Sequence, residues 1–341
     1  MRRVRTVLAG IERLEMGRPW LAVPVAVVKK FGEDRAGGLA GLMAYYAFFS
    51  LFPLLLVLVT VLGIVLKNSP ELQQRILDSA LAQFPVIGDQ LRQNTGSLDV
   101  SGFALVVGLG SALWAGTGVM KAAEDAMNDV WDVPMRERPN FITSLLRALL
   151  MLVVLGGGIA ATSVLTGTMG SVDASLPIRV IGIVAGGGLN IGLVLLAFRF
   201  LTVRNIPVRQ LLPGAVLAGV AWLGLQAAGG YLLEHQVAEA SNTYGTFAVV
   251  IGLLWWLYLQ AQVFLFAAEL NVVLTNRLWP RSLTGVDSEA DRRALRRHAA
   301  VEERAREETV DVRFRDDDSE AEGARASFTP EERRARTVHS R

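Results

Sequence analysis

The sequence contains no cysteine and only three histidines, which limits the chemistry that the chain can carry out. Without cysteine there is no disulfide, no thiolate ligand for a metal and no cysteine nucleophile. A zinc-ligand cluster, a phosphate-binding P-loop and the Gly-x-Ser-x-Gly motif of serine hydrolases are also missing from any context that would support them. We therefore expect no catalytic residue, no metal site and no cofactor, and we expect that the protein is not an enzyme.

Charged residues are also scarce. They make up 19% of the 341 residues, whereas hydrophobic residues make up 52% and the mean hydropathy is +0.38. About a quarter of the residues of a typical soluble domain are charged, so this composition indicates a membrane protein. The net charge of +2 is too small to suggest a nucleic-acid partner.

The charge that is present is concentrated at the C-terminal end. Residues 281–341 contain 14 Arg and 15 Asp or Glu but few large apolar residues. We expect a charged cytoplasmic tail with a solvated helix that starts at Asp287 or Ser288, followed by disorder from about Asp316. The chain is thus divided into a cytoplasmic or interfacial segment at residues 1–38, a transmembrane domain at 39–280 and the tail at 281–341.

Long apolar segments are abundant. A helix needs about 20 apolar residues to cross a hydrocarbon layer of about 30 Å, and these runs lack the alternation of a β-barrel strand. The sequence therefore predicts an all-α, polytopic membrane protein with about six transmembrane helices. The predicted spans are Leu39–Leu66, Gly102–Met120, Ile142–Thr168, Val180–Leu201, Leu211–Leu233 and Thr246–Leu274.

The segments that connect these spans differ in positive charge. Most arginines and lysines lie before the first span and in the second and fourth connections, whereas the third and fifth connections contain one arginine between them. Because arginine and lysine are retained on the cytoplasmic side, both termini are predicted to be cytoplasmic. An even number of spans also places both termini on the same side.

The first external connection is longer than the others. Within it Leu72, Ile76 and Phe84 share one helical face with further apolar residues. This pattern predicts an amphipathic helix over Pro70–Phe84, on the outer membrane surface or over the end of the bundle. A packing element and a functional gate both remain open as interpretations.

Polar side chains in the second span and its extension need an explanation, because polar groups in a bilayer are costly. They follow one another at spacings of three and four residues and so share one helical face. We expect Lys121 to pair with Asp125 along the helix, and an acidic metal site is disfavoured because Lys121 neutralises part of the charge. The residues of this face are Trp114, Thr117, Lys121, Glu124, Asp125, Asn128 and Asp129.

The first and last spans carry similar faces. Glu269 lies near the cytoplasmic end of the last span, at about the depth of Lys121, so we predict that these two residues approach each other across a helix interface. Pro53 is expected to kink the first span. The faces comprise Tyr46, Ser50, Pro53 and Thr60 in the first span, and Trp255, Tyr258, Gln262 and Glu269 in the last. Whether such faces line a substrate path or only hold helices together is left open.

Glycine is frequent in the spans. Gly156–Gly158 and Gly186–Gly188 are runs of three, and the pairs Gly182–Gly186 and Gly188–Gly192 have the spacing of a helix-packing motif. We predict that these glycines allow close approach between helices; hinges for alternating access are the alternative, which glycines alone do not show.

Three stretches of the sequence carry a family resemblance. They are Ala44–Pro53 (AYYAFFSLFP), Leu113-Trp114 followed by Glu124–Trp131 (EDAMNDVW), and Tyr244–Thr246 followed by Trp255–Tyr258 and Ala267–Asn271 (AAELN). Together they resemble the YihY/virulence factor BrkB family of bacterial inner-membrane proteins, over most of residues 30 to 280. Family members often have Gly-Ala-Glu where this chain has Ala267-Ala268-Glu269.

The resemblance implies a six-span, multi-pass protein of the bacterial inner membrane that contributes to envelope integrity. Membrane lipids are the implied partners, with envelope proteins as further candidates, and the oligomeric state is left undetermined. The leading hypothesis is movement of a lipid or another amphiphile or small solute through a polar path between the first, second and last spans. A scaffold that moves nothing is the alternative, and a membrane-bound ribonuclease is a remote one, because the family was once labelled ribonuclease BN and nothing in this sequence supports RNA cleavage.

The candidate residues for the polar path or helix interface are Tyr46, Ser50, Pro53, Trp114, Lys121, Glu124, Asp125, Asn128, Asp129, Tyr244, Trp255, Tyr258, Gln262, Glu269 and Asn271.

Overall fold

The structure is a computed structural model that describes residues 19–65, 71, 102–169, 176–232, 246–282 and 288–314. These residues form α-helices joined by short connections and single turns of 3-10 helix, so the predicted all-helical fold is confirmed. The six long helices are α3 (Ala36–Val65), α6 (Gly102–Val130), α7 (Phe141–Met169), α8 (Leu176–Leu201), α9 (Val208–Leu232) and α11 (Thr246–Thr275). Two shorter helices are α2 (Pro19–Glu33) and α12 (Glu289–Ala299).

The long helices coincide with the predicted spans. Helix α6 continues to Val130, well past the predicted span end at Met120, because its last turns are polar and extend beyond the apolar segment. Among the described residues, the stretches long and apolar enough to cross a membrane are Phe141–Gly158, Val208–Gln226 and Val250–Thr275, with shorter apolar stretches in α3 and α8. The total of six spans stays a prediction.

The outer surface of the bundle is strongly apolar. Phe141 and Ile142 of α7 are 68% and 71% exposed, and Phe247 of α11 is 76% exposed. Large apolar side chains are also exposed along α9, including Val220. A soluble monomer rarely exposes so much contiguous apolar surface to water. In a membrane protein, lipid tails surround such side chains, so their exposure on the bundle is expected.

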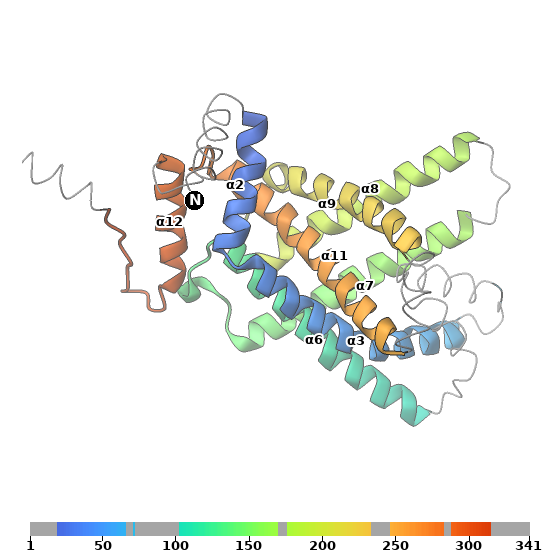
Figure 1. The fold of residues 1–341 in the computed structure, drawn as a ribbon. Coiled ribbons are helices and arrows are strands. Elements are labelled where there is room, and N and C mark those ends of the chain that lie inside the picture. Colours follow the sequence, from blue (N-terminus) through green and yellow to red (C-terminus); the bar gives the residue numbers. More distant parts are fainter. Residues whose placement is uncertain are drawn as a thin grey trace, which may run out of the picture.

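Helix α11 lies at the centre of the bundle and packs against α2, α3, α6 and α9. Helix α6 packs between α3 and α7, and α8 packs between α7 and α9. The long helices run away from the end of the molecule at which α2 and α12 lie (Figure 1). The core between them contains large, fully buried side chains such as Met127, Phe198 and Leu265.

Most of the glycines that the sequence singled out do not mediate helix contacts. A Cβ atom added at Gly156, Gly157 or at any glycine of Gly186–Gly188 would meet nothing within 4 Å, and the same holds for Gly192. Gly158 does allow close packing, because a Cβ there would lie 2.3 Å from Leu193 of α8. The prediction that the GxxxG spacing in α8 brings helices together is therefore wrong for Gly186, Gly188 and Gly192.

Several predictions fall outside the described residues. These are the amphipathic helix over Pro70–Phe84, the position of Tyr244 and the disorder from about Asp316. Pro53 lies within the continuous helix α3, and the kink expected there stays a prediction.

Candidate functional site

A buried cluster of charged groups lies where α2, α6 and α11 meet. We call Lys30, Asp34, Asp132 and Glu269 the Lys30 cluster. Lys30 is only 2% exposed, and its ammonium forms an ion pair with Asp34 four residues along the chain. The same nitrogen lies 3.4 Å from Asp132 Oδ1 and 3.6 Å from Glu269 Oε2, and it donates to the Val130 carbonyl at 3.0 Å. One ammonium therefore contacts three carboxyl groups from three parts of the chain.

Local structure explains how the cluster forms. Helix α2 ends at Glu33, and Arg35 has a positive φ of 51°, so the chain turns between α2 and α3. The turn leaves α2 packed on α11, where Phe31 stacks on Phe266 with ring centroids 3.8 Å apart. Asp132 follows the end of α6 and also has a positive φ, of 50°, which aspartate tolerates better than most residues.

The electrostatics of the cluster keep its lysine charged. Burial by itself lowers the pKa of Lys30, but the carboxylates of Glu269, Asp132 and Asp34 outweigh that effect and raise it. Burial by itself raises the pKa of Asp34, but the imidazole of His298 and the ammonium of Lys30 outweigh that effect and lower it. These shifts keep Lys30 protonated and Asp34 ionised, so the two groups form a charged pair that ties the end of α2 to α6 and α11.

The helix of the tail is docked against this end of the bundle. Arg281 has no exposed side-chain surface, and its guanidinium binds both carboxylate oxygens of Glu33 at 2.8 and 2.9 Å and Asp291 Oδ1 at 2.8 Å. Lys29 also binds Asp291, at 2.8 Å. The predicted helix start at Ser288 is confirmed by its side chain, which accepts from the Asp291 amide. The prediction of a solvated helix is wrong, because α12 buries Ala290, Asp291 and Ala294.

A second contact joins α12 to the Lys30 cluster and should make docking depend on pH. Arg297 binds Asp132 at 3.1 Å, and His298 Nδ1 lies 3.5 Å from Asp34 Oδ1. The hydrogen bond to Asp34 raises the pKa of His298 despite partial burial. His298 therefore stabilises the docked helix fully below its ordinary pKa of about 6.5, and this contribution is lost as the pH rises through the raised value.

We accordingly expect amide hydrogen exchange in α12, corrected for intrinsic rates, to show fewer opening events at about pH 5.5 than at about pH 8.5. Asp34 stays charged over that range because its pKa is lowered. A His298→Gln variant should lose the difference. Equal protection of the wild-type helix at both pH values would show that the imidazole does not contribute to docking.

The residues on the polar face of α6 contact different parts of the chain. Glu124 accepts from the Ser144 hydroxyl at 2.7 Å and lies 3.7 Å from Arg147, so it holds the start of α7. Asn128 accepts from the Val203 amide at 3.0 Å, and Asp129 binds Arg138 at 2.5 Å. Asp125 is exposed.

The predicted approach of Lys121 to Glu269 is not the arrangement found. The cation beside Glu269 is Lys30, and the Lys121 ammonium lies 4.4 Å from the ring centroid of Phe141. Lys121 and Asp125 also form no ion pair within 4 Å, although both residues are described. The reason is that α2 turns back onto α11 and places Lys30 next to Glu269.

The candidate residues of α3 and α11 form mostly helix contacts. Tyr258 accepts from Gln262 at 3.0 Å, and Ser50 donates to the Ala47 carbonyl at 2.9 Å. Asn271 accepts from the Gly214 amide at 2.7 Å and donates to the Leu211 carbonyl at 3.1 Å, which joins α11 to α9. Trp255 is half exposed on the outside of α11.

A large groove lies on the outer side of the bundle between α3, α6 and α7. We call it the α3–α6–α7 groove, and its volume is about 880 Å³. Lys121 is the charged residue of its lining, and Trp114, which is 84% exposed, and Thr117 lie on the same helix. The lining residues are Tyr45, Tyr46, Phe49, Gly110, Leu113, Trp114, Ala115, Thr117, Gly118, Lys121, Phe141, Leu145 and Leu149.

The groove brings together three of the candidate residues, Tyr46, Trp114 and Lys121. Gly118 permits this arrangement, because a Cβ there would lie 2.9 Å from the Tyr46 ring. The groove can hold an elongated apolar molecule against aromatic side chains and present one ammonium to an anionic group. Such a surface suits an amphiphile.

Two carboxylates of the Lys30 cluster and His298 have the spacing of metal ligands. Ligand atoms of Asp34, Asp132 and His298 all lie within 4.8 Å of one another. The Lys30 ammonium already contacts both of these carboxylates, and Arg297 also binds Asp132. Cationic side chains thus supply the positive charge that an ion would bring, and these residues fit an ion-pair network better than a metal site.

The sequence did not identify Lys30, Asp34, Asp132 or Arg281 as site residues. Lys30 counted only among the positive charges before the first span, and Arg281 only as part of the tail. Glu269 did indicate a buried ion pair, because a carboxylate in an apolar helix requires a nearby cation. Choosing between the available cations requires the tertiary fold.

Comparison with known proteins identifies the relatives of this chain. A family model described as Virulence factor BrkB matches residues 27–291. No solved structure matches significantly.

Among curated proteins, the chain is 25% identical over 258 residues to "Putative ribonuclease-like protein YfkH" of Bacillus subtilis (strain 168), covering 69% of this chain and 88% of that protein. It is 30% identical over 264 residues to a "UPF0761 membrane protein" of Azoarcus sp. (strain BH72), covering 72% of this chain and 62% of that protein. It is 24% identical over 287 residues to "Inner membrane protein YhjD" of Escherichia coli (strain K12), covering 78% of this chain and 84% of that protein.

Proposed function

The chain belongs to the Virulence factor BrkB family of membrane proteins, and from this premise we propose that it binds a membrane lipid or a similar amphiphile and moves it along the α3–α6–α7 groove. The bacterial inner membrane is the proposed location, with both termini in the cytoplasm. The observation that carries the proposal is the combination of a long aromatic surface with a single ammonium, from Lys121, in a groove that opens to the outside of the bundle.

Physical chemistry favours an amphiphile over a polar solute as the cargo. The groove is lined mainly by aromatic and aliphatic side chains; its polar groups are Lys121, Thr117, two tyrosine hydroxyls and the indole N–H of Trp114. A polar solute would lose its hydration there and regain only a few hydrogen bonds, because most of the lining is apolar. Transfer of an acyl chain from the surrounding lipid into the groove costs little free energy, because both environments are apolar. An anionic headgroup would in addition pair with the Lys121 ammonium, and this attraction is strong where the dielectric constant is low.

The proposed path differs from the one expected from the sequence. In the last span, Glu269 and Asn271 are engaged in buried contacts, and Tyr258 and Gln262 bind each other. These groups serve helix packing in the proposal, so of the three polar faces only those of α3 and α6 contribute to the groove, which α7 completes. A role in envelope integrity would then follow from the distribution of lipid between the two leaflets.

The competing proposal is a scaffold that binds envelope proteins and moves nothing. The exposed aromatic residues of the groove would then contact another membrane protein. A nuclease activity is suggested only by the printed name of the Bacillus subtilis relative, and among the described residues we find no arrangement that supports RNA cleavage. The protein is therefore proposed not to be an enzyme.

Movement of headgroup-labelled phosphatidylglycerol in liposomes tests the proposal. Liposomes containing the purified protein should exchange label between leaflets faster than empty ones. Lys121→Met should slow the exchange about tenfold, because a hydrogen bond to a charged group contributes about 1.5–3 kcal/mol. Trp114→Ala should also slow it, since Trp114 lines the groove.

Trp255→Ala is the matched control, because Trp255 is an exposed tryptophan of α11 that does not line the groove. It should leave the rate unchanged. Protein that is folded but moves no lipid faster than empty liposomes would reject transport in favour of the scaffold. Equal losses for both tryptophan variants would place any movement elsewhere than in this groove.

A further inference from the structure

A second pocket lies between α7 and α8, on the other side of α7 from the groove. Leu145 and Leu149 face the groove, whereas Arg147 and Met151 line this pocket. A step of two residues along a helix turns the side chain by about 200°, so one helix separates the two sites. We call it the α7–α8 pocket, and its volume is about 300 Å³.

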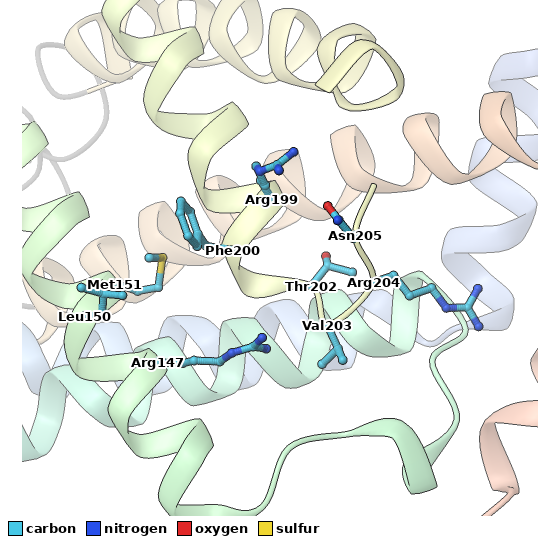
Figure 2. Close-up of a pocket in the computed structure, with 9 residues that line it drawn as sticks. All are labelled: Arg147, Leu150, Met151, Arg199, Phe200, Thr202, Val203, Arg204 and Asn205. Carbon is cyan, nitrogen blue, oxygen red and sulfur yellow. The ribbon is translucent and has the colours of Figure 1, made fainter. Parts of the chain in front are cut away.

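The lining of the α7–α8 pocket combines positive charge with an apolar end. Figure 2 shows Leu150, Met151 and Phe200 together on one side and Arg204 and Asn205 on the other. Arg147 projects from α7 and Arg199 from α8 (Figure 2). The complete lining is Arg147, Leu150, Met151, Arg199, Phe200, Thr202, Val203, Arg204 and Asn205.

Two of the arginines have no acidic partner in the described part of the chain. The guanidinium of Arg199 donates to the Ile206 carbonyl at 3.4 Å, and that of Arg204 donates to the Asp132 carbonyl at 3.2 Å. A neutral carbonyl orients a guanidinium but does not neutralise it. Arg147 shares Glu124, at 3.7 Å, with the Ser144 hydroxyl. The pocket therefore carries a surplus of positive charge.

Buried polar atoms of the pocket also lack hydrogen-bond partners. Thr202 is only 3% exposed, and its hydroxyl has no partner among the described residues. The Nη1 nitrogen of Arg147 is buried without a hydrogen bond, although it lies 3.7 Å from Glu124 Oε1 in an ion pair. A buried donor without a partner is unfavourable, so a group that accepts from the Thr202 hydroxyl would be bound favourably.

We propose that the α7–α8 pocket is a binding site for a phosphate group, carried by a membrane phospholipid or free in solution. Arginine suits phosphate because its planar donors match two phosphate oxygens at once. The Thr202 hydroxyl donates to a third oxygen, and Asn205 lies beside it. The apolar side chains Leu150 and Phe200 accommodate the glycerol and the start of an acyl chain when a lipid carries the phosphate. The site needs no movement of lipid in the groove, so it can exist whether or not transport does.

Native mass spectrometry of the purified full-length protein in detergent tests the site. Three probes are compared: phosphatidylglycerol, diacylglycerol with the same acyl chains, and inorganic phosphate. Phosphatidylglycerol should bind at least tenfold more tightly than diacylglycerol, which lacks the phosphate. Thr202→Val and Arg199→Gln should each weaken phosphatidylglycerol binding about tenfold.

Arg209→Gln is the control, because Arg209 is an exposed arginine at the start of α9 that does not line the pocket. It should bind phosphatidylglycerol within about twofold of the wild type. Valine has nearly the same shape as threonine, so we expect Thr202→Val to fold. This variant alone can therefore test phosphate binding in the α7–α8 pocket even if Arg199→Gln does not fold. Inorganic phosphate that displaces the lipid at millimolar concentration would identify the anion itself as the ligand. Failure to displace it would identify a lipid headgroup.

The proposal is overturned if Thr202→Val and Arg199→Gln bind phosphatidylglycerol as tightly as the wild type, or if diacylglycerol binds equally well. The results for the Thr202 and Arg199 variants do not bear on transport through the groove, which the Lys121 and Trp114 variants test separately.

Discussion

Replacing Lys30 with methionine is expected to lower the free energy of unfolding by about 3–5 kcal/mol, the usual cost of removing one partner from a buried ion pair. Methionine preserves most of the side-chain length but removes the ammonium. The carboxylates of Asp34, Asp132 and Glu269 would then lie close together without it, and Glu269 has no exposed surface. Arg297 and His298 would remain near Asp132 and Asp34, but no other cation lies within 4 Å of Glu269 among the described residues.

Unfolding of the purified protein in detergent measures this effect. Arg209→Met is a suitable control, because Arg209 is exposed and such substitutions usually change stability by less than about 0.5 kcal/mol. If Lys30→Met were as stable as Arg209→Met, Lys30 would not be the group that holds the cluster together.

A double substitution separates charge from packing. Glu269→Gln removes the carboxylate charge while keeping the shape of the side chain. Adding it to Lys30→Met should recover part of the lost stability, because it removes the carboxylate of Glu269, which Lys30→Met leaves with no cation within 4 Å among the described residues. Additive losses in the double variant would instead indicate that the methionine fits the site poorly.

The positions of the long helices could be predicted from the sequence because hydropathy and length are local properties. Gly102–Met120 was long and apolar enough to identify α6, and the polar face that followed indicated that the helix continues. No knowledge of neighbouring helices was needed for either inference. The expected start of the tail helix at Ser288 was also local, since an N-cap serves the amide two or three residues on.

Contacts between distant segments could not be predicted in the same way. Lys30 and Asp132 are separated by 102 residues, and Lys29 and Asp291 by 262. The sequence correctly required a cation for Glu269, but equal depth in the membrane could not decide between Lys121 and Lys30. The deciding feature is the turn at Arg35, which folds α2 back onto α11.

The composition of the tail was misleading for a related reason. Mixed Arg and Glu usually mark a solvated helix, and Glu289 and Arg296 of α12 are exposed as that pattern predicts. Arg281 and Asp291 instead form a buried network with Glu33 and Lys29. The pattern of residues within the tail does not show that groups of opposite charge from the N-terminal segment pack against it.

Substitution of Gly214 with alanine is the second change expected to have a large effect, a loss of about 3 kcal/mol or more of stability. A Cβ at this position would lie 2.1 Å from the backbone oxygen of Ala267 and 2.5 Å from the Asn271 amide nitrogen. A backbone atom cannot move aside as the end of a side chain can. Helices α9 and α11 would have to separate, which would also weaken the hydrogen bonds of Asn271 to Gly214 and Leu211.

Gly224→Ala in the same helix is the matched control, because a Cβ there would meet nothing within 4 Å. Alanine favours helix over glycine by up to about 1 kcal/mol in soluble helices, so this variant should be as stable as the wild type or slightly more so. Unfolding in detergent compares the two. Similar behaviour of both variants would mean that α9 and α11 are not in close contact at Gly214.

The source of the loss at Gly214 can be identified with Asn271→Ala, which removes the amide but adds no atoms. Two hydrogen bonds disappear in this variant, so it should be destabilised on its own. If contact with the Asn271 side chain caused the loss, Gly214→Ala would cost little in the Asn271→Ala background. Because the nearest atom is the Ala267 backbone oxygen, which Asn271→Ala leaves in place, we expect Gly214→Ala to remain strongly destabilising there. Full recovery in the double variant would assign the close approach to the side chain rather than to the helix backbones.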